Sequence, residues 1–206
     1  MWSLLERRTQ LIIIVGAGVC LAWACDAIYG FLTGQVPNNI KLISLIVFMI
    51  GVVFAKVAEI AWRPLWRRIP LLQRKIFPDL NGNWKGTLTS TCVDPTTGSP
   101  EPPIPTEIII RQGLFTTSVS LSTQESASHS TRSFLEPFRD TGRFRIWYSY
   151  NNDPQAQIRH RSSPHEGISF LECEFDVDHD RLTGRYYTDR RTTGDIDVRR
   201  KKSKGR

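Results

Sequence analysis

The sequence predicts a membrane-anchored all-β protein, in which two N-terminal transmembrane helices precede an antiparallel β-barrel of roughly eight strands. Two observations support this fold class. Residues 11–62 contain two long apolar runs with a short polar break between them. From Asn81 onward, apolar and polar residues alternate with a period of two, which is typical of strands with one buried face.

The two apolar runs have the length of membrane spans. A helix needs about 20 mostly apolar residues to cross a bilayer, and residues 11–32 meet this length with Asp26 as their one charge. Residues 40–62 meet it if Lys41 and Lys56 extend their ammonium groups to the two interfaces. The seven residues between the runs contain a glycine and a proline, so we expect a helical hairpin.

Basic residues flank both ends of this hairpin. Arg7 and Arg8 precede it, and five Arg or Lys residues follow it between Arg63 and Lys75, whereas the turn carries none. The positive-inside rule therefore predicts two spans with both termini in the cytoplasm. A cleaved signal peptide is the alternative, but a signal core is shorter and no second span would follow at once.

Asp26 is unusual because a carboxylate at membrane depth is costly and normally faces water or a partner. Three roles stay open for it: lining a pore in an oligomer, pairing with Lys41, or lying hydrated at the interface of a short span.

We divide the chain into a hairpin (1–62), a juxtamembrane connector (63–78), a barrel (79–198) and a basic tail (199–206). Residues 1–80 carry nine basic and four acidic residues (+5), residues 81–198 carry twelve and sixteen (−4), and the tail carries six basic residues (+6). Because a nucleic-acid polymer requires a basic surface, an acidic barrel is a poor candidate to bind one. The tail either contacts anionic lipid or is simply solvated.

The sequence contains no constellation typical of catalysis or metal binding. Its four cysteines and four histidines are scattered without the spacing of metal ligands. It has no nucleophile motif and no glycine-rich phosphate loop followed by a helix. We therefore expect a binding protein rather than an enzyme, with no catalytic residues, no metal and no cofactor.

The barrel strands are expected where alternation is clearest. They cover residues 84–92, 107–111, 118–122, 126–135, 143–150, 170–176, 182–187 and 196–198. Polar loops with prolines are expected at 93–105 and 151–164. An eight-stranded barrel is just wide enough to be filled by side chains or to hold one small ligand.

Two motifs are specific enough to suggest a family. Residues 78–86 read PDLNGNWKG, and residues 182–191 read LTGRYYTDRR. The first resembles the G-x-W of lipocalins, so we assign Trp84 a structural role as a plug in the floor of a lipocalin-like barrel. With the two preceding apolar spans, the chain resembles the two-transmembrane, β-strand-rich effectors of bacterial CBASS anti-phage defence (the SMODS-associating type).

That resemblance implies a function. A partner nucleotidyltransferase would make a cyclic di- or oligonucleotide, which the cytoplasmic barrel would bind. The protein would then form a homo-oligomer in the bacterial inner membrane, and its helices would disrupt the lipid bilayer and kill the cell. The alternative is a membrane-anchored, lipocalin-like module for an apolar ligand, without killing activity. A third possibility is a purely structural scaffold with no cavity.

A cyclic dinucleotide carries two phosphates and two bases, so its site needs guanidinium or amide donors and aromatic faces. Two predicted strands supply such residues. The candidates are Tyr148, Tyr150, Arg185, Tyr186, Arg190 and Arg191. Alternation directs the three tyrosines inward, where they either contact a ligand or only fill the barrel. It directs Arg185 outward and leaves Arg190 and Arg191 in a turn at the rim.

Overall fold

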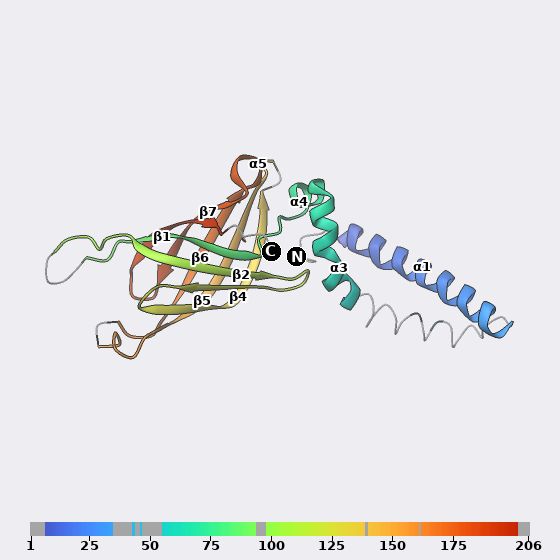
Figure 1. Ribbon diagram of the computed structural model, residues 1–206, viewed down its shortest axis with the longest axis horizontal. Coiled ribbons are helices and arrows are strands. Elements are labelled where there is room, and N and C mark those ends of the chain that lie inside the picture. The colour runs from blue at the N-terminus through green and yellow to red at the C-terminus, as the bar shows by residue number, and fades with distance from the viewer. Residues whose placement is uncertain are drawn as a thin grey trace. The chain divides into compact units, whose positions relative to one another are not determined.

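The computed structural model describes residues 7–34, 43, 46, 55–93, 98–138, 140–160 and 162–201. The chain divides into two compact units, residues 2–68 and residues 69–206 (Figure 1). The first unit contains the described N-terminal helices, and the second contains the barrel.

The first unit contains helices α1 (Arg7–Thr33) and α3 (Ala55–Arg68). Most of the predicted second span lies outside the described residues, as does the side chain of Asp26, whose backbone belongs to α1. Helix α3 continues through Pro64 and ends six residues beyond the predicted span, with Arg67 and Arg68 in its last turn. Basic side chains there are favourable, because the C-terminal end of a helix carries partial negative charge.

Among the described residues, no helix is both long enough and apolar enough to cross a membrane.

The second unit begins with helix α4 (Pro70–Lys75). Pro70 occupies the first turn, where its missing N–H costs no helical hydrogen bond. Near the other end of this helix, Arg74 forms an ion pair of 2.9 Å with Asp176, in the short helix α5 (Phe175–Asp178). This exposed pair joins the connector to the loop after the sixth strand.

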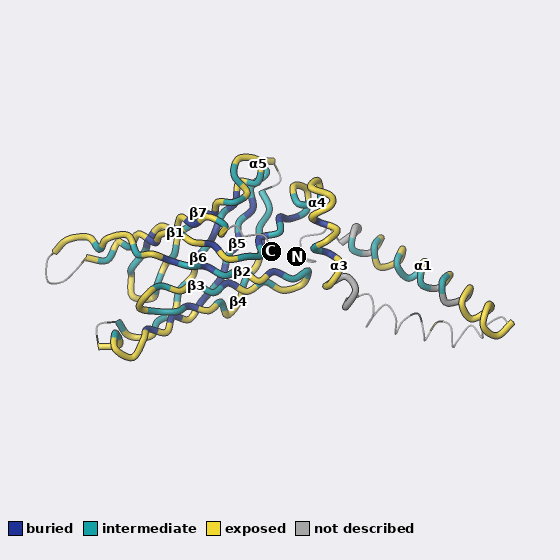
Figure 2. Tube along the Cα trace, in the orientation of Figure 1, coloured by how far each residue is buried: buried dark blue, intermediate teal, exposed yellow. Residues whose placement is uncertain are grey.

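Eight antiparallel strands form a closed barrel, in which each strand pairs with the next and the first pairs with the last (Figure 1). They are β1 (Gly82–Ser90), β2 (Ile104–Gln112), β3 (Thr117–Ser122), β4 (Ser126–Phe138), β5 (Arg143–Pro154), β6 (His165–Glu174), β7 (Arg181–Thr188) and β8 (Thr193–Arg200). The predicted antiparallel barrel is therefore confirmed, and buried positions alternate along its strands (Figure 2).

Several strand ends differ from the sequence prediction. Strand β2 begins at Ile104 and strand β5 continues to Pro154, so both extend into the predicted loops at 93–105 and 151–164, and strand β6 begins at His165 rather than at 170. Strand β6 ends at Glu174, because the chain then turns through α5 and Asp178 accepts a hydrogen bond of 3.1 Å from the N–H of Asp180. Strand β8 includes Arg199 and Arg200, which we had placed in the tail. Arg200 is held there by Asp180, whose Oδ1 lies 3.0 Å from its Nε.

We call the end of the barrel where β1 begins the floor end, and the end where β1 finishes the rim end. The floor half of the interior is filled with apolar side chains. Those with at most 4 % exposure include Trp84, Ile108, Ile110, Val119, Leu135, Phe144, Ile146, Leu171, Leu182 and Val198. Burial of this apolar surface is the main favourable contribution to folding.

Trp84 lies at the centre of the floor. Its side chain is fully buried, and its Nε1–H donates a hydrogen bond of 3.2 Å to the carbonyl of Leu80. The guanidinium of Arg200 lies over the indole ring, 4.2 Å from the ring centroid, and donates to the carbonyl of Asp79 at 3.0 Å. The expected plug is therefore a stack of a tryptophan and an arginine.

Gln112, at the end of β2, fastens the connector to this floor. Its Oε1 accepts a hydrogen bond of 2.7 Å from the N–H of Leu80, and its Nε2 donates to the carbonyl of Pro78 at 3.0 Å. The side chain of Asn81 in turn bonds both the N–H and the carbonyl of Gln112, at 2.7 and 2.8 Å. Residues 78–81 are thus joined to the end of β2 by four hydrogen bonds.

We predict that Gln112→Leu lowers the free energy of unfolding by about 3 kcal/mol. Leucine is similar to glutamine in volume but has no polar group. The N–H of Leu80 and the carbonyl of Pro78 would therefore lose their partners, and each such loss costs roughly 1–3 kcal/mol. Urea unfolding of the full chain in detergent, followed by tryptophan fluorescence, measures the change. Arg111→Leu is the matched control, since this neighbour is exposed. Equal stability of the two variants would contradict the assigned role.

Candidate ligand site at the rim end of the barrel

The rim half of the interior is polar, in contrast to the floor half. Inward positions there include the aliphatic Leu88, Ile104, Leu121 and Ile196, but most carry hydroxyl or amide side chains: Ser90, Ser128, Ser130, Tyr148, Tyr150, Asn152, Ser169 and Tyr186. Ser128 and Asn152 are both buried and joined by a hydrogen bond of 2.8 Å. A polar ligand can therefore find donors and acceptors in this half of the barrel.

Two tyrosines follow one another on the inner face of β5. The ring centroids of Tyr148 and Tyr150 lie 6.0 Å apart. Burial raises the pKa of Tyr148 to about 12 and also raises the pKa of Tyr150. Both phenols are therefore uncharged at neutral pH and able to donate as well as accept hydrogen bonds.

Glycines opposite the tyrosines make room for their rings. Gly167 on β6 pairs with Tyr150, and a Cβ at this glycine would lie 2.4 Å from the Tyr150 hydroxyl. Gly194 on β8 pairs with Tyr186, and a Cβ there would lie 2.4 Å from the Tyr186 ring. The Tyr186 hydroxyl then reaches Ser90 at 2.9 Å. The rings thus occupy space that no side chain opposite them fills.

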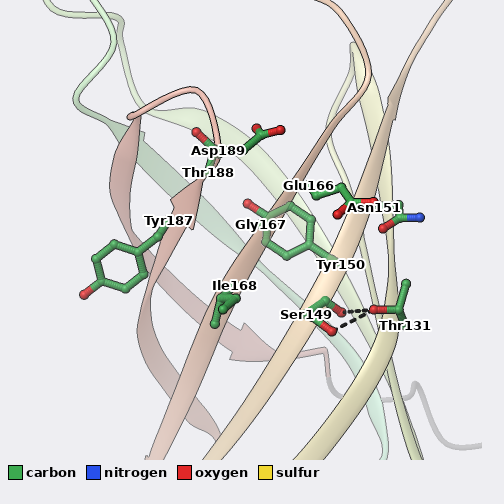
Figure 3. A pocket seen from close by; sticks show the side chains of 10 residues that line it. All are labelled: Thr131, Ser149, Tyr150, Asn151, Glu166, Gly167, Ile168, Tyr187, Thr188 and Asp189. Atoms are coloured by element: carbon green, nitrogen blue, oxygen red, sulfur yellow. Dashed lines mark hydrogen bonds between the residues drawn. The ribbon is translucent and has the colours of Figure 1, made fainter.

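A pocket of about 580 Å³ opens on the outer surface of the rim-end parts of β4 to β7, since Ser149, Asn151, Glu166, Ile168 and Tyr187 among its lining residues occupy outward positions (Figure 3). This volume is within the range of small-ligand sites. Its lining residues are Thr131, Ser149, Tyr150, Asn151, Glu166, Gly167, Ile168, Tyr187, Thr188 and Asp189. In Figure 3 the Tyr150 ring lies beside Gly167, between β5 and β6, so an inward residue contributes to the pocket wall.

The three candidate arginines lie in different places. Arg190, in the turn between β7 and β8, has its Nη1 3.3 Å from Ser162 Oγ and its Nη2 3.4 Å from His165 Nε2. Arg191 is exposed in the same turn and has a left-handed backbone with φ of 63°. Arg185 lies on the outer face, where its Nε is 3.2 Å from Asp195 Oδ1. The structure therefore brings Arg190, but not Arg185, to the rim end together with the three tyrosines.

His165 belongs to this site, although the sequence analysis gave it no role. Its Nδ1 lies 3.1 Å from the carbonyl of Ser163, and its Nε2 faces Arg190. These partners favour the neutral tautomer with hydrogen on Nδ1. Burial, and to a smaller extent the charge of Arg190, lower the pKa of His165, while the Ser163 carbonyl and Asp189 act in the opposite direction.

The alternation of inward and outward positions along β6 would have identified His165. This histidine shares the inward side of β6 with Gly167 and Ser169, but the strand was predicted to start only at 170. In the part of the chain that the structure describes, no group of three or more His, Cys, Asp or Glu side chains is arranged to hold a metal ion.

A closed eight-stranded barrel with a packed floor and a hydroxyl-lined rim end defines the class of small-ligand-binding β-barrels. Comparison with protein families matches residues 75–200 to the Cap15 cyclic dinucleotide receptor domain, and this chain belongs to that family. The match starts at the end of α4 and stops at the last residue of β8. A search among curated proteins found no match.

Membership of this family confirms the resemblance to CBASS effectors and identifies the barrel as their cyclic-nucleotide-sensing part. The matched range includes the connector segment that Gln112 and Arg200 fasten to the floor. The domain therefore consists of the strands together with this segment.

We predict that Gly194→Ala destabilises the barrel by about 2 kcal/mol, because overpacking typically costs 1–3 kcal/mol. The new methyl group would meet both the Tyr186 ring and the carbonyl of Thr89. Ser90→Ala, which removes the hydrogen bonds that Ser90 Oγ accepts from the Tyr186 hydroxyl and the Cys92 N–H, should cost about 1–2 kcal/mol. Thermal unfolding measures both changes. A Gly194→Ala variant as stable as the parent would contradict the packing of Tyr186 over this glycine.

Proposed function

We propose that the chain is an effector whose barrel binds a cyclic dinucleotide at the rim end, after which copies oligomerise and the N-terminal hairpin disrupts the bacterial inner membrane, causing cell death. One observation carries this proposal. A domain of the cyclic dinucleotide receptor family has an interior that is apolar at the floor and polar, with tyrosines, at the rim.

The rim residues suit the chemistry of the ligand. Aromatic faces such as those of Tyr150 and Tyr186 stack on bases, and one such contact is worth roughly 1–3 kcal/mol. The guanidinium of Arg190 can form charge-assisted hydrogen bonds with a phosphate. Arg190 and His165 lie together at the rim and do not line the pocket that Glu166 and Asp189 make acidic, so we place the phosphates beside this arginine and histidine. Arg185 is left out of this site because it faces outward and pairs with Asp195.

The membrane part of the proposal rests on the sequence. Two apolar runs of spanning length with basic flanks support two spans with cytoplasmic termini, and Asp26 is the polar position in the first. This topology would expose the barrel to a cyclic oligonucleotide released by a nucleotidyltransferase in the same compartment. We propose that the protein acts by binding and association, not by catalysis.

The alternative function, a carrier for an apolar ligand, receives less support. Such a carrier needs a wide apolar cavity, but the apolar half of this interior is filled by Trp84 and its buried neighbours. In the polar half, an apolar ligand would meet hydroxyl groups such as that of Tyr186 rather than a continuous apolar wall.

We predict that Arg190→Ala weakens cyclic dinucleotide binding at least tenfold, since a hydrogen bond to a charged group contributes about 1.5–3 kcal/mol. The test uses the full chain in dye-loaded vesicles and a panel of purine cyclic dinucleotides, with calorimetry for binding and dye release for membrane disruption. Arg181→Ala, which removes an exposed arginine paired with Asp197 near the floor end, is the control and should bind like the parent.

Two outcomes would count against the proposal. If no cyclic dinucleotide binds to the folded parent protein, the sensing function is wrong and apolar ligands should be tested next. If one binds but the dye stays in the vesicles, sensing stands and membrane disruption is wrong.

Binding should also take up a proton at His165. The pKa of this residue lies below its usual value of 6.5 in the free protein, and a phosphate placed beside the imidazole would raise it. The bound state then holds more protons, so affinity should increase as the pH falls from about 8 towards 6. Calorimetry in two buffers of different ionisation enthalpy measures the uptake. His165→Gln should abolish it, and binding without proton uptake by the parent would contradict a phosphate at this position.

A further inference from the structure

The outer surface of β4 to β7 carries a cluster of large apolar side chains. The strand register places Phe134 beside Trp147 and Trp147 beside Phe170, so three aromatic residues form one row across three strands. Ile168 and Tyr187 continue the cluster in the next row. We call these five residues the outer aromatic face. Three of them are well exposed: Phe134 at 63 %, Ile168 at 53 % and Tyr187 at 39 %.

The outer surface elsewhere on the barrel is different in character. Outward positions on β1, β3 and β8 carry small polar or charged residues, such as Lys85, Thr87, Ser118, Ser120, Asp195 and Asp197. Exposed apolar residues that occur singly need no explanation, but a contiguous apolar patch on a soluble domain marks an interaction site. The outer aromatic face is such a patch on one side of the barrel.

Its side chains are held in place by charged neighbours. Arg145 donates to Glu172 through Nε and Nη2, at 2.9 and 2.7 Å, and its guanidinium lies 4.5 Å from the Phe170 ring centroid. Trp147 packs against Phe170 at 5.0 Å and donates its indole N–H to Glu136 at 2.8 Å. A surface ordered in this way loses little conformational entropy on binding, and Trp, Tyr and Arg are the residue types that dominate binding energy at interfaces.

The charges around the face are balanced. Arg143 and Arg145 share Glu172, and Arg185 pairs with Asp195. In all, the outward positions of β4 to β7 carry five basic and five acidic residues: Arg132, Arg143, Arg145, Arg181 and Arg185 against Glu136, Asp153, Glu166, Glu172 and Glu174. An anionic lipid surface would require an excess of basic residues, which this face lacks. The face is apolar, and basic and acidic side chains surround it in balance. Two copies of such a surface can pack against each other, as a two-fold symmetric contact requires.

The exposed area of the face suits a weak contact between two copies of the chain. A standard interface buries about 800 Å² on each partner. Five partly exposed side chains provide only the centre of such an area, since an aromatic residue has roughly 150–250 Å² to bury in total. A weak contact is sufficient for copies that share a membrane, because tethering raises their effective concentration.

We propose that the outer aromatic face is the surface through which two copies of this chain contact each other. The inference rests on the proposed function for the membrane tether and for the link to ligand binding, but not for the contact itself. Ile168 and Tyr187 belong both to this face and to the wall of the rim pocket (Figure 3). A ligand in the pocket and a second copy therefore touch the same two side chains, which gives the ligand a direct route to influence association.

The test uses Phe134→Glu, because Phe134 is exposed and does not line the pocket. Full-length chains labelled at the carboxyl terminus with donor or acceptor dyes are reconstituted together in vesicles, without nucleotide, over a range of protein-to-lipid ratios. Phe134→Glu should require at least a tenfold higher surface density than the parent for half-maximal energy transfer. Ile109→Glu, the same change at an outward position of β2, is the matched control and should behave as the parent.

Circular dichroism melting confirms that both variants are folded. If folded Phe134→Glu associates like the parent, or if the parent shows no transfer at any density, the inference is overturned. Nucleotide binding is measured on the same vesicles, so that the two proposals can fail separately. Loss of association in Phe134→Glu, in a protein that binds no cyclic dinucleotide, would support this face and contradict the sensing function.

Discussion

The stack of the Arg200 guanidinium on the Trp84 indole is the contact on which the rest of the barrel depends. It joins the last residue of the last strand to the first strand, and so closes the barrel at the floor. The same arginine bonds the carbonyl of Asp79 and the carboxylate of Asp180. A fully buried indole needs a partner for its N–H, and Leu80 supplies it from the connector. This one contact therefore links the pairing of β8 with β1, the packing of the floor and the position of the segment just before β1.

A floor sealed in this way decides where a ligand can bind. The floor half of the interior is filled by packed side chains and leaves no room for a ligand, as the complete burial of Trp84 and its neighbours shows. The rim half is lined by hydroxyls, and Gly167 and Gly194 leave space in which the rings of Tyr150 and Tyr186 lie. Tyrosine fits such a position because its ring packs against apolar surface while its hydroxyl remains available for hydrogen bonding.

The alternation of apolar and polar residues predicted the features that depend only on which side of a strand a residue faces: the strands, the inward tyrosines and the outward Arg185. The structural role of Trp84 was predicted from the G-x-W motif. Features that depend on tertiary pairing were missed. Arg200 sits in a basic run that reads as a tail, since nothing local reveals the Asp180 carboxylate beside it. Gln112 lies just beyond the predicted strand 107–111, and nothing local reveals that its amide spans two backbone groups thirty or more positions earlier in the chain. The same alternation also put Trp147 on the outer face, but only the strand register brings it beside Phe134 and Phe170.

The geometry also limits how ligand binding at the rim can affect the N-terminal segment that is attached to the floor. The connector is fastened at the floor, whereas the polar site lies at the rim, and strands of eight or more residues separate the ends by roughly 20–30 Å. A closed barrel with a packed floor has no free edge and no gap along which strands can slide, so a change of shape passed from rim to floor would have to break the core. The outer aromatic face avoids this difficulty, because it borders the pocket through Ile168 and Tyr187 on the side of the barrel. The proposed association across that side would bring the connectors of two copies together without any rearrangement inside the barrel. For a rigid receptor, this requires less structural change than a signal passed through the core.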